Sequence, residues 1–206
     1  MNCIRLQSVR LILIGLLAIS CAKNDTDPLD SDESGGEMIG NSLHVAFETP
    51  DWSRHIDCSR LDLDPYDSGS TDEWVYVFAS SESTRCTFVL SYPKYAGDLE
   101  KSGNIGTYPA AEYRKPTGPF QYGMSLPLDA QKLDSSFGRL VSTAGSSGQE
   151  FTEITEIRRV ATDGEYAVFQ IKGRYGFQST LETLSGSAQG KYVKGTFHLK
   201  VRALIE

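Results

Sequence analysis

Short runs in which apolar and polar residues alternate recur from residue 40 to the C-terminus, and this period of two restricts the chain to β-structure. A strand points successive side chains to opposite faces, so each alternating run predicts a strand with one buried face. In the run 194–204, for example, Phe197, Leu199 and Val201 share one face. We therefore predict one all-β domain over residues 40–206, an antiparallel β-sandwich or a barrel-like domain.

Hairpin and helix signals refine this expectation. The clearest hairpin joins residues 73–79 to residues 84–92 through a polar turn. Further strands are expected over residues 43–48, 55–63, 150–160, 165–175 and 194–204. Evidence for helix is limited to 129–133, where Asp129 is placed to cap a short turn. We expect less than about a tenth of the chain to be helical.

Residues 1–20 predict an export signal. Arg5 and Arg10 supply basic charge around an apolar run of nine residues, 11–19. A spanning helix needs about 20 apolar residues, whereas a secretory signal uses a run of roughly 7 to 15. We therefore expect residues 1–20 to be removed as a signal peptide.

The end of this segment resembles the lipobox of bacterial lipoproteins. Residues 17–21 read Leu-Ala-Ile-Ser-Cys, with Ala18 where such boxes prefer Leu. The resemblance implies cleavage before Cys21, lipidation of its thiol and an outer membrane lipoprotein held by two or three acyl chains. The alternative is an ordinary signal peptide cut near Ser20, with Cys21 as a free thiol.

Residues 21–39 are expected to form a flexible acidic tether. Residues 24–37 hold six acidic side chains and no basic one, so they have little apolar surface to bury. The segment also resembles the short acidic tag that sends some Gram-negative lipoproteins to the cell surface. A plain acidic linker on a periplasmic protein is the alternative.

Two cysteines remain once Cys3 leaves with the signal and Cys21 is lipidated. Cys58 and Cys86 each lie in a strand-like run. In an exported chain such a pair predicts a disulfide between neighbouring strands.

Four short motifs in residues 104–203 resemble an ordered pattern in small uncharacterised bacterial lipoproteins with all-β domains. They are Gly-Thr-Tyr at 106–108, Ile-Thr-Glu-Ile at 154–157, Gly-Arg-Tyr at 173–175 and Gly-Thr-Phe at 195–197. The resemblance implies a fold type and carries over no catalytic residue.

Signals for chemistry are sparse. A net charge of -7 disfavours nucleic acid as a partner, because binding to phosphates needs clustered basic residues. We find no nucleophile motif, no metal-binding spacing and no cofactor motif, so no catalytic residue, metal or cofactor is assigned. The loop 62–73 is rich in Asp and Ser but fails the calcium-loop spacing. His44, His55 and His198 are each expected to be exposed strand residues.

The segment 92–127 concentrates five of the ten tyrosines together with basic residues, Arg114 among them. Rings on loops can form a platform for a glycan or an envelope protein. Its candidate residues are Tyr108, Tyr113, Phe120 and Tyr122. The alternative is that these rings pack a long crossover onto the sheet.

We therefore expect a lipid-anchored envelope protein that is not an enzyme and acts as a binding or accessory module. An alternative is a structural subunit of a surface appendage, which would use residues 194–204 as an exposed edge strand. A hydrolase is a weaker alternative.

Overall fold

The computed structural model describes residues 40–61, 63, 65, 73–145 and 148–206. The predicted signal peptide, Cys21, the predicted tether and most of the loop 62–73 lie outside the described residues. Strand accounts for 58% of the described residues and helix for 6%, which confirms the all-β prediction and the low helix content. Within the described residues, no helix has both the length and the apolar character that crossing a membrane requires.

Ten strands and three short helical segments make up the described part of the chain. The strands are β1 (His44–Glu48), β2 (Ser53–Asp57), β3 (Trp74–Ser80), β4 (Thr87–Pro93), β5 (Gly106–Tyr108), β6 (Tyr122–Pro127), β7 (Arg139–Ser142), β8 (Phe151–Asp163), β9 (Tyr166–Thr183) and β10 (Gly186–Leu204). The helical segments are α1 (Ala96–Leu99) and the 3-10 turns η1 (Ser102–Asn104) and η2 (Ser135–Phe137).

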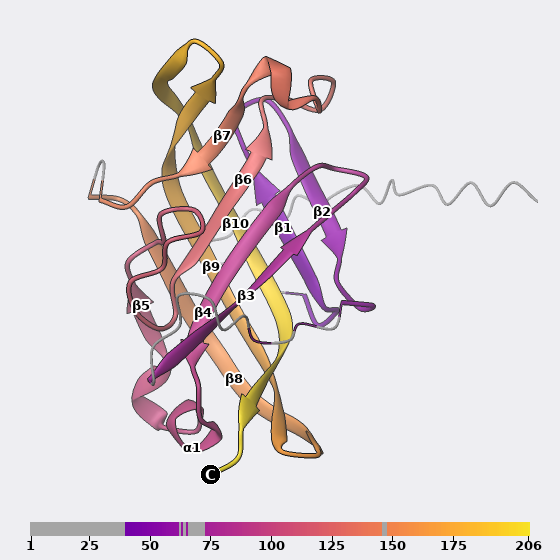
Figure 1. Ribbon diagram of the computed structural model, residues 1–206, viewed down its shortest axis with the longest axis vertical. Helices are drawn as coiled ribbons and strands as arrows, with labels where there is room; N and C mark the ends of the chain where they lie inside the picture. Colours follow the sequence, from indigo (N-terminus) through magenta and orange to yellow (C-terminus); the bar gives the residue numbers. More distant parts are fainter. Residues whose placement is uncertain (1–39, 62, 64, 66–72, 146–147) are drawn as a thin grey trace, which may run out of the picture. The chain divides into compact units, whose positions relative to one another are not determined.

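The strands form one antiparallel sheet that is not closed, in the order β2-β1-β10-β9-β7-β6-β4-β3. β9 has two successive partners along one edge, β8 along its first part and β7 near its end, and β5 pairs with β8. Figure 1 shows β3 and β4 crossing in front of β9 and β10. The Tyr92 hydroxyl on β4 donates to the Arg202 carbonyl on β10 across 2.9 Å. The sheet therefore curls so that β4 and β10 face each other across the core.

A stack of aromatic rings fills the centre of this core. The Tyr122 ring lies 4.2 Å from the Tyr175 ring and 5.1 Å from the Phe197 ring, between centroids, and Phe88 stacks 6.1 Å from Tyr122. These rings come from β4, β6, β9 and β10, and all four side chains are buried. Burying each of them stabilises the fold by about 1.5–3 kcal/mol. The stack therefore holds the two halves of the curled sheet together.

The predicted hairpin is confirmed, because β3 pairs with β4 over their whole lengths. The predicted helical turn at 129–133 is wrong. Asp129 Oδ1 does accept the backbone N–H groups of Gln131 and Lys132, but the segment bends without forming a helix. Strands β6 and β7 are not among the predicted strands. β6 contains Gly, Ser and Pro and no β-branched residue, and β7 has only four residues, so neither shows the composition or length of a strand signal.

The appendage alternative requires residues 194–204 to form an exposed edge strand, and the sheet order does not place them at an edge. β10 lies inside the sheet, with β9 along one side and β1 along the other over residues 194–198. Beyond β1, the Leu204 N–H donates to the Lys94 carbonyl, and Leu63 forms an isolated bridge with Val201. The backbone groups that an added strand would need are thus largely used within the chain.

Candidate functional site

An open cleft of about 850 Å³ lies where the β3–β4 turn meets β7 and the loop between β6 and β7. Most of the residues that line it are polar, and they include three arginines, three carboxylates and five aliphatic hydroxyl groups. We call it the arginine cleft. The lining residues are Ser80, Ser81, Glu82, Arg85, Thr87, Tyr113, Arg114, Ser125, Leu133, Asp134, Ser135, Arg139, Val141 and Glu182.

Arg139, the first residue of β7, is fixed in the floor of the cleft. Its Nε donates to Ser125 Oγ across 2.7 Å, and its Nη2 donates to the carbonyls of Arg85 (2.7 Å) and Ser125 (3.0 Å). Burial lowers the pKa of Arg139, but a guanidinium stays charged at any physiological pH. Its side chain therefore ties the β3–β4 turn to β6 and places a positive charge in the cleft.

The other two cleft arginines have an unusual backbone conformation. Arg85 has φ +56° and Arg114 has φ +63°, and Phe120, at +59°, is the third non-glycine residue with positive φ among those described. A bulky residue in this left-handed region costs about 1–3 kcal/mol and persists only where its surroundings enforce it. Such strain clusters at binding sites.

Aromatic rings orient the Arg114 side chain. Its guanidinium carbon lies 4.7 Å from the centroid of the Phe78 ring and 5.2 Å from that of the Tyr113 ring. The Tyr113 hydroxyl is in turn hydrogen-bonded to the Thr87 hydroxyl on β4. A guanidinium held against ring faces keeps its N–H edges available for a planar anion.

None of the three arginines forms an ion pair within the described residues. The cleft nevertheless contains carboxylates. Glu182 on β9 lies opposite Arg139 in the strand register. Asp134 Oδ1 accepts the Ser136 N–H across 2.8 Å, and this bond, with Arg85 nearby, lowers the pKa of Asp134. Both charge signs therefore line the cleft without neutralising one another in direct pairs.

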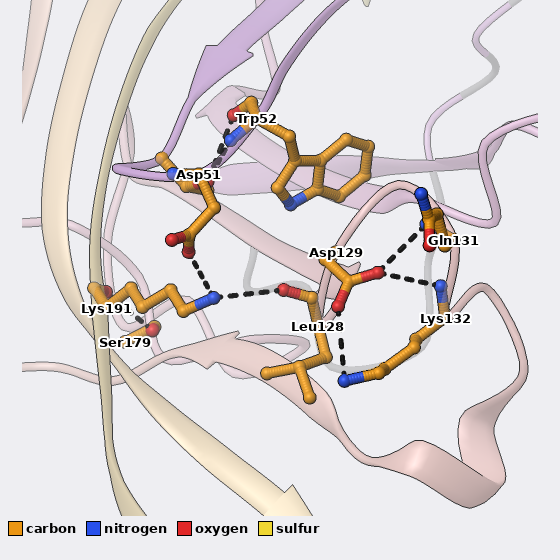
Figure 2. A network of polar contacts seen from close by, with 9 residues as sticks. Asp51, Trp52, Leu128, Asp129, Gln131, Lys132, Ser179 and Lys191 are labelled. Atoms are coloured by element: carbon orange, nitrogen blue, oxygen red, sulfur yellow. Dashed lines mark hydrogen bonds and ion pairs between the residues drawn. The ribbon is translucent and has the colours of Figure 1, made fainter.

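The loop that forms one wall of the cleft is anchored on its other side by a lysine from β10, as Figure 2 shows. Lys191 Nζ forms an ion pair with Asp51 in the β1–β2 turn and donates to the Leu128 carbonyl across 3.4 Å. Asp129 then accepts two backbone N–H groups and pairs with Lys132 Nζ at 3.5 Å. These contacts hold the beginning of the loop that leads to Leu133 and Asp134.

The predicted aromatic platform is corrected by the burial of two of its members. Phe120 is 1% exposed and Tyr122 is 0% exposed, so both rings belong to the core. Tyr108 is half-buried, with its ring 5.0 Å from that of Phe120. Tyr113 is half-buried and lines the cleft. The four rings therefore do not share one exposed surface, because β6 carries Tyr122 into the centre of the sheet.

The predicted disulfide is not formed in the structure, where Cys58 and Cys86 are both buried free thiols. Cys58 follows β2 and Cys86 precedes β4, and these strands are not neighbours in the sheet. The Cys58 thiol donates to the Ile56 carbonyl at 3.5 Å and the Cys86 thiol to the Thr84 carbonyl at 3.6 Å. Burial raises the pKa of Cys58 to about 12 and that of Cys86 to about 11, so neither is a reactive thiolate.

All three histidines gather on the outer face of the sheet, which no local spacing indicated. His44 on β1 lies opposite His198 on β10 in the register, and His55 on β2 stacks on His44 at 4.7 Å between centroids. The prediction that each is exposed holds only for His55, because His44 and His198 are each 2% exposed.

Two of these imidazoles fasten the chain segment that enters β1. His44 Nδ1 and His198 Nδ1 both lie within hydrogen-bond distance of the Ser42 carbonyl, at 2.7 and 3.1 Å. A carbonyl only accepts, so each Nδ1 carries a proton. His44 Nε2 then bonds Thr196 Oγ1 at 3.0 Å, while His198 Nε2 is buried without a partner among the described residues.

Burial is the main cause that lowers the pKa values of both His44 and His198, and Lys172 adds to it. Lys172 itself pairs with Glu156 at 2.9 Å. The lowered pKa values favour the neutral imidazoles of His44 and His198, and the hydrogen bonds of these two residues are structural. Within the residues that the structure describes, no group of three or more His, Cys, Asp or Glu side chains is arranged to hold a metal ion.

Of the cleft arginines, only Arg114 lies in the segment 92–127 that the sequence singles out. Arg85, Arg114 and Arg139 come from three separate connections or strand ends, and no local spacing links them. The expected strand 84–92 included Arg85, so no pattern in the sequence singled this residue out. Comparisons with protein families, with curated proteins and with solved structures found no match.

Proposed function

We propose that this chain is a lipid-anchored protein of the cell envelope that acts as a non-enzymatic binding module, with the arginine cleft as its site for an anionic ligand. The observation that carries the proposal is the set of three cleft arginines without ion-pair partners among the described residues. The cleft also contains three carboxylates, so its formal charges balance. What it offers an anion is a set of guanidinium N–H donors that no ion pair occupies, and these form strong charge-assisted hydrogen bonds with carboxylate or phosphate groups.

The fixed geometry of the site supports the same conclusion. Arg139 is held by three hydrogen bonds, and Arg114 is held by two rings. Donors that are already in place lose little conformational entropy on binding, so more of their interaction energy is realised as affinity.

The proposal of a lipid anchor is based on the sequence. The apolar run 11–19 ends at a lipobox-like segment with Cys21, and an acidic stretch follows it. Together they would place the binding domain on a tether at the outer membrane, on its periplasmic or its surface face. Radiolabelled palmitate supplied to cells expressing the full chain tests this part. Label should enter the membrane fraction with wild type and be lost with Cys21→Ala, and equal label in both would overturn the anchor.

The binding site is tested on the full chain in detergent. Titration calorimetry with small carboxylate, sulfate and phosphate compounds should show binding that weakens as salt rises, because ions screen charges over about 10 Å at 0.1 M. Binding should be lost in Arg114→Gly. The exposed Arg60, outside the cleft, supplies the matched control Arg60→Ala, which should bind as wild type does. Equal weakening by both substitutions would refute the site.

A further inference from the structure

We infer that the ligand of the arginine cleft is an acidic sugar, meaning a short glycan segment in which a carboxylate accompanies several hydroxyl groups. This inference rests on the proposed binding function and narrows it to one ligand class. Its basis is the mixture of side chains that the cleft presents: guanidinium groups, carboxylates and hydroxyls around a single open volume.

The guanidinium groups are suited to binding a planar anion. The Arg114 guanidinium carbon lies over the Phe78 and Tyr113 rings. The N–H groups of a guanidinium point outward in its own plane, where they can reach a ligand. A carboxylate can accept two parallel N–H bonds in that plane. Arg139 uses Nε and Nη2 within the protein, and Nη1 makes no hydrogen bond to the described residues. Each arginine therefore has donors left for a ligand.

The carboxylates argue against a ligand that is anionic along its whole length. Glu82, Asp134 and Glu182 line the same cleft as the arginines. An acidic peptide or a polyphosphate would bring several negative charges close to these groups, and like charges placed against one another across an interface disfavour binding. A ligand that combines one anionic group with neutral hydrogen-bond donors avoids this repulsion.

Sugar hydroxyls are such donors. Each can donate to a carboxylate oxygen and accept from a hydroxyl side chain, and the cleft offers Ser80, Ser81 and Ser135 besides its three carboxylates. A neutral sugar would satisfy these groups but would leave the arginines desolvated without an anion, which costs binding energy. The combination therefore selects sugars that carry an acid.

The size of the cleft fits this class. Its volume of about 850 Å³ lies within the range of about 300–1,000 Å³ that small-molecule sites occupy. The cleft is open to solvent, so a segment of a longer chain can lie in it with both ends free. We therefore expect recognition of a few sugar residues.

The experiment uses the full chain in detergent and titration calorimetry. The acidic probes are trigalacturonate, glucuronate and sialyllactose, each matched with a neutral counterpart: maltotriose, glucose and lactose. Tetraglutamate peptide and inorganic phosphate are the non-sugar anions. At least one acidic sugar should bind about tenfold or more tightly than its neutral counterpart and than both non-sugar anions. A tenfold difference in affinity is what one or two charge-assisted hydrogen bonds are expected to contribute.

Three variants separate the inference from the function on which it rests. Arg114→Gly should abolish binding of the acidic sugar, and Arg60→Ala should leave it unchanged. Glu182→Gln should weaken binding of the acidic sugar and strengthen binding of tetraglutamate. If tetraglutamate or phosphate binds as tightly as every acidic sugar, and Arg114→Gly abolishes that binding, the cleft is an anion site and the sugar assignment is wrong. If no probe binds in a way that depends on Arg114, the proposed binding site itself is wrong.

Discussion

Phe197 on β10 lies directly opposite Gly173 on β9, and its ring covers the glycine so closely that a Cβ at position 173 would collide with it. The neighbouring pair is reciprocal, because Tyr175 on β9 lies opposite Gly195 on β10, and a Cβ there would lie 2.7 Å from the Tyr175 hydroxyl. The repeated Gly-x-aromatic pattern thus places a ring from each strand over a glycine of the other. This arrangement allows the two rings to enter the central stack.

Gly173→Ala is therefore expected to destabilise the fold by about 1–3 kcal/mol or more, the usual cost of overpacking a filled core. Besides the ring, the new Cβ would meet the Glu153 carbonyl oxygen at 2.5 Å, and backbone cannot easily move away. Gly106→Ala is the control, since no atom lies within 4 Å of a Cβ there. Chemical denaturation measures the free energy of unfolding of both variants. Equal values for the two would contradict the packing argument.

Arg114→Gly and Phe120→Gly should differ sharply although both residues have nearly the same φ, 63° and 59°. Glycine relieves the left-handed strain in each case but adds unfolded-state entropy of about 0.5–1 kcal/mol. Arg114 is exposed, so its variant should stay within about 1 kcal/mol of wild type. Phe120 is buried, so its variant should lose about 3–5 kcal/mol. Urea unfolding tests this, and a comparable loss in both would show that Arg114 is structural.

Stability should decrease as pH falls from about 7 to 5, because of His44 and His198. Their pKa values are lowered in the folded protein. As the pH falls, the histidines of the unfolded chain are therefore protonated first, near their ordinary pKa of about 6.5. Where the unfolded state binds more protons, stability falls with falling pH. The loss develops between that value and the lower folded pKa values. Glu153 and Glu156, whose pKa values are also lowered, add their loss only below about 4.5.

The variant that checks this is His198→Asn, which keeps a donor near the position of Nδ1 for the Ser42 carbonyl and cannot titrate. Its stability should change less than that of wild type between pH 7 and pH 5. At pH 8, where both imidazoles are neutral in either state, the comparison reports only the cost of the substitution itself. An unchanged pH dependence would exclude His198 from the linkage.

Both cysteines should be protected in the native protein and reactive once it unfolds. Their raised pKa values and their burial predict negligible alkylation at pH 8 without denaturant. In denaturant without reductant, intact-mass measurement should show Cys58 and Cys86 both alkylated. If alkylation in denaturant requires prior reduction, the chain carries the bridge that the sequence predicts for an exported protein.

Strand content and the β3–β4 hairpin could be predicted from the sequence because both depend on local information. Two runs rich in β-branched and aromatic residues, 73–79 and 84–92, with a polar turn between them, predict two strands and their pairing, which β3 and β4 confirm. The same reasoning missed β6, because its sequence YGMSLP contains Gly, Ser and Pro and no β-branched residue, so it lacks the composition of a strand. It also offered residues 194–204 as the candidate edge strand of the appendage alternative, because one strand's pattern does not reveal how many neighbours the strand has.

The candidate site could not be predicted without the tertiary structure, for a related reason. The sequence by itself determined an acidic all-β chain with an export-like N-terminus and a Gly-x-aromatic pattern that reappears as the paired rings of β9 and β10. Only the folded sheet decided that Arg85, Arg114 and Arg139 meet in one cleft, that Tyr122 is core, and that His198 lies beside His44. Alternation shows which side chains share a face of a strand. What covers that face is set by contacts between strands far apart in the chain, and those contacts leave no periodic trace in either strand alone.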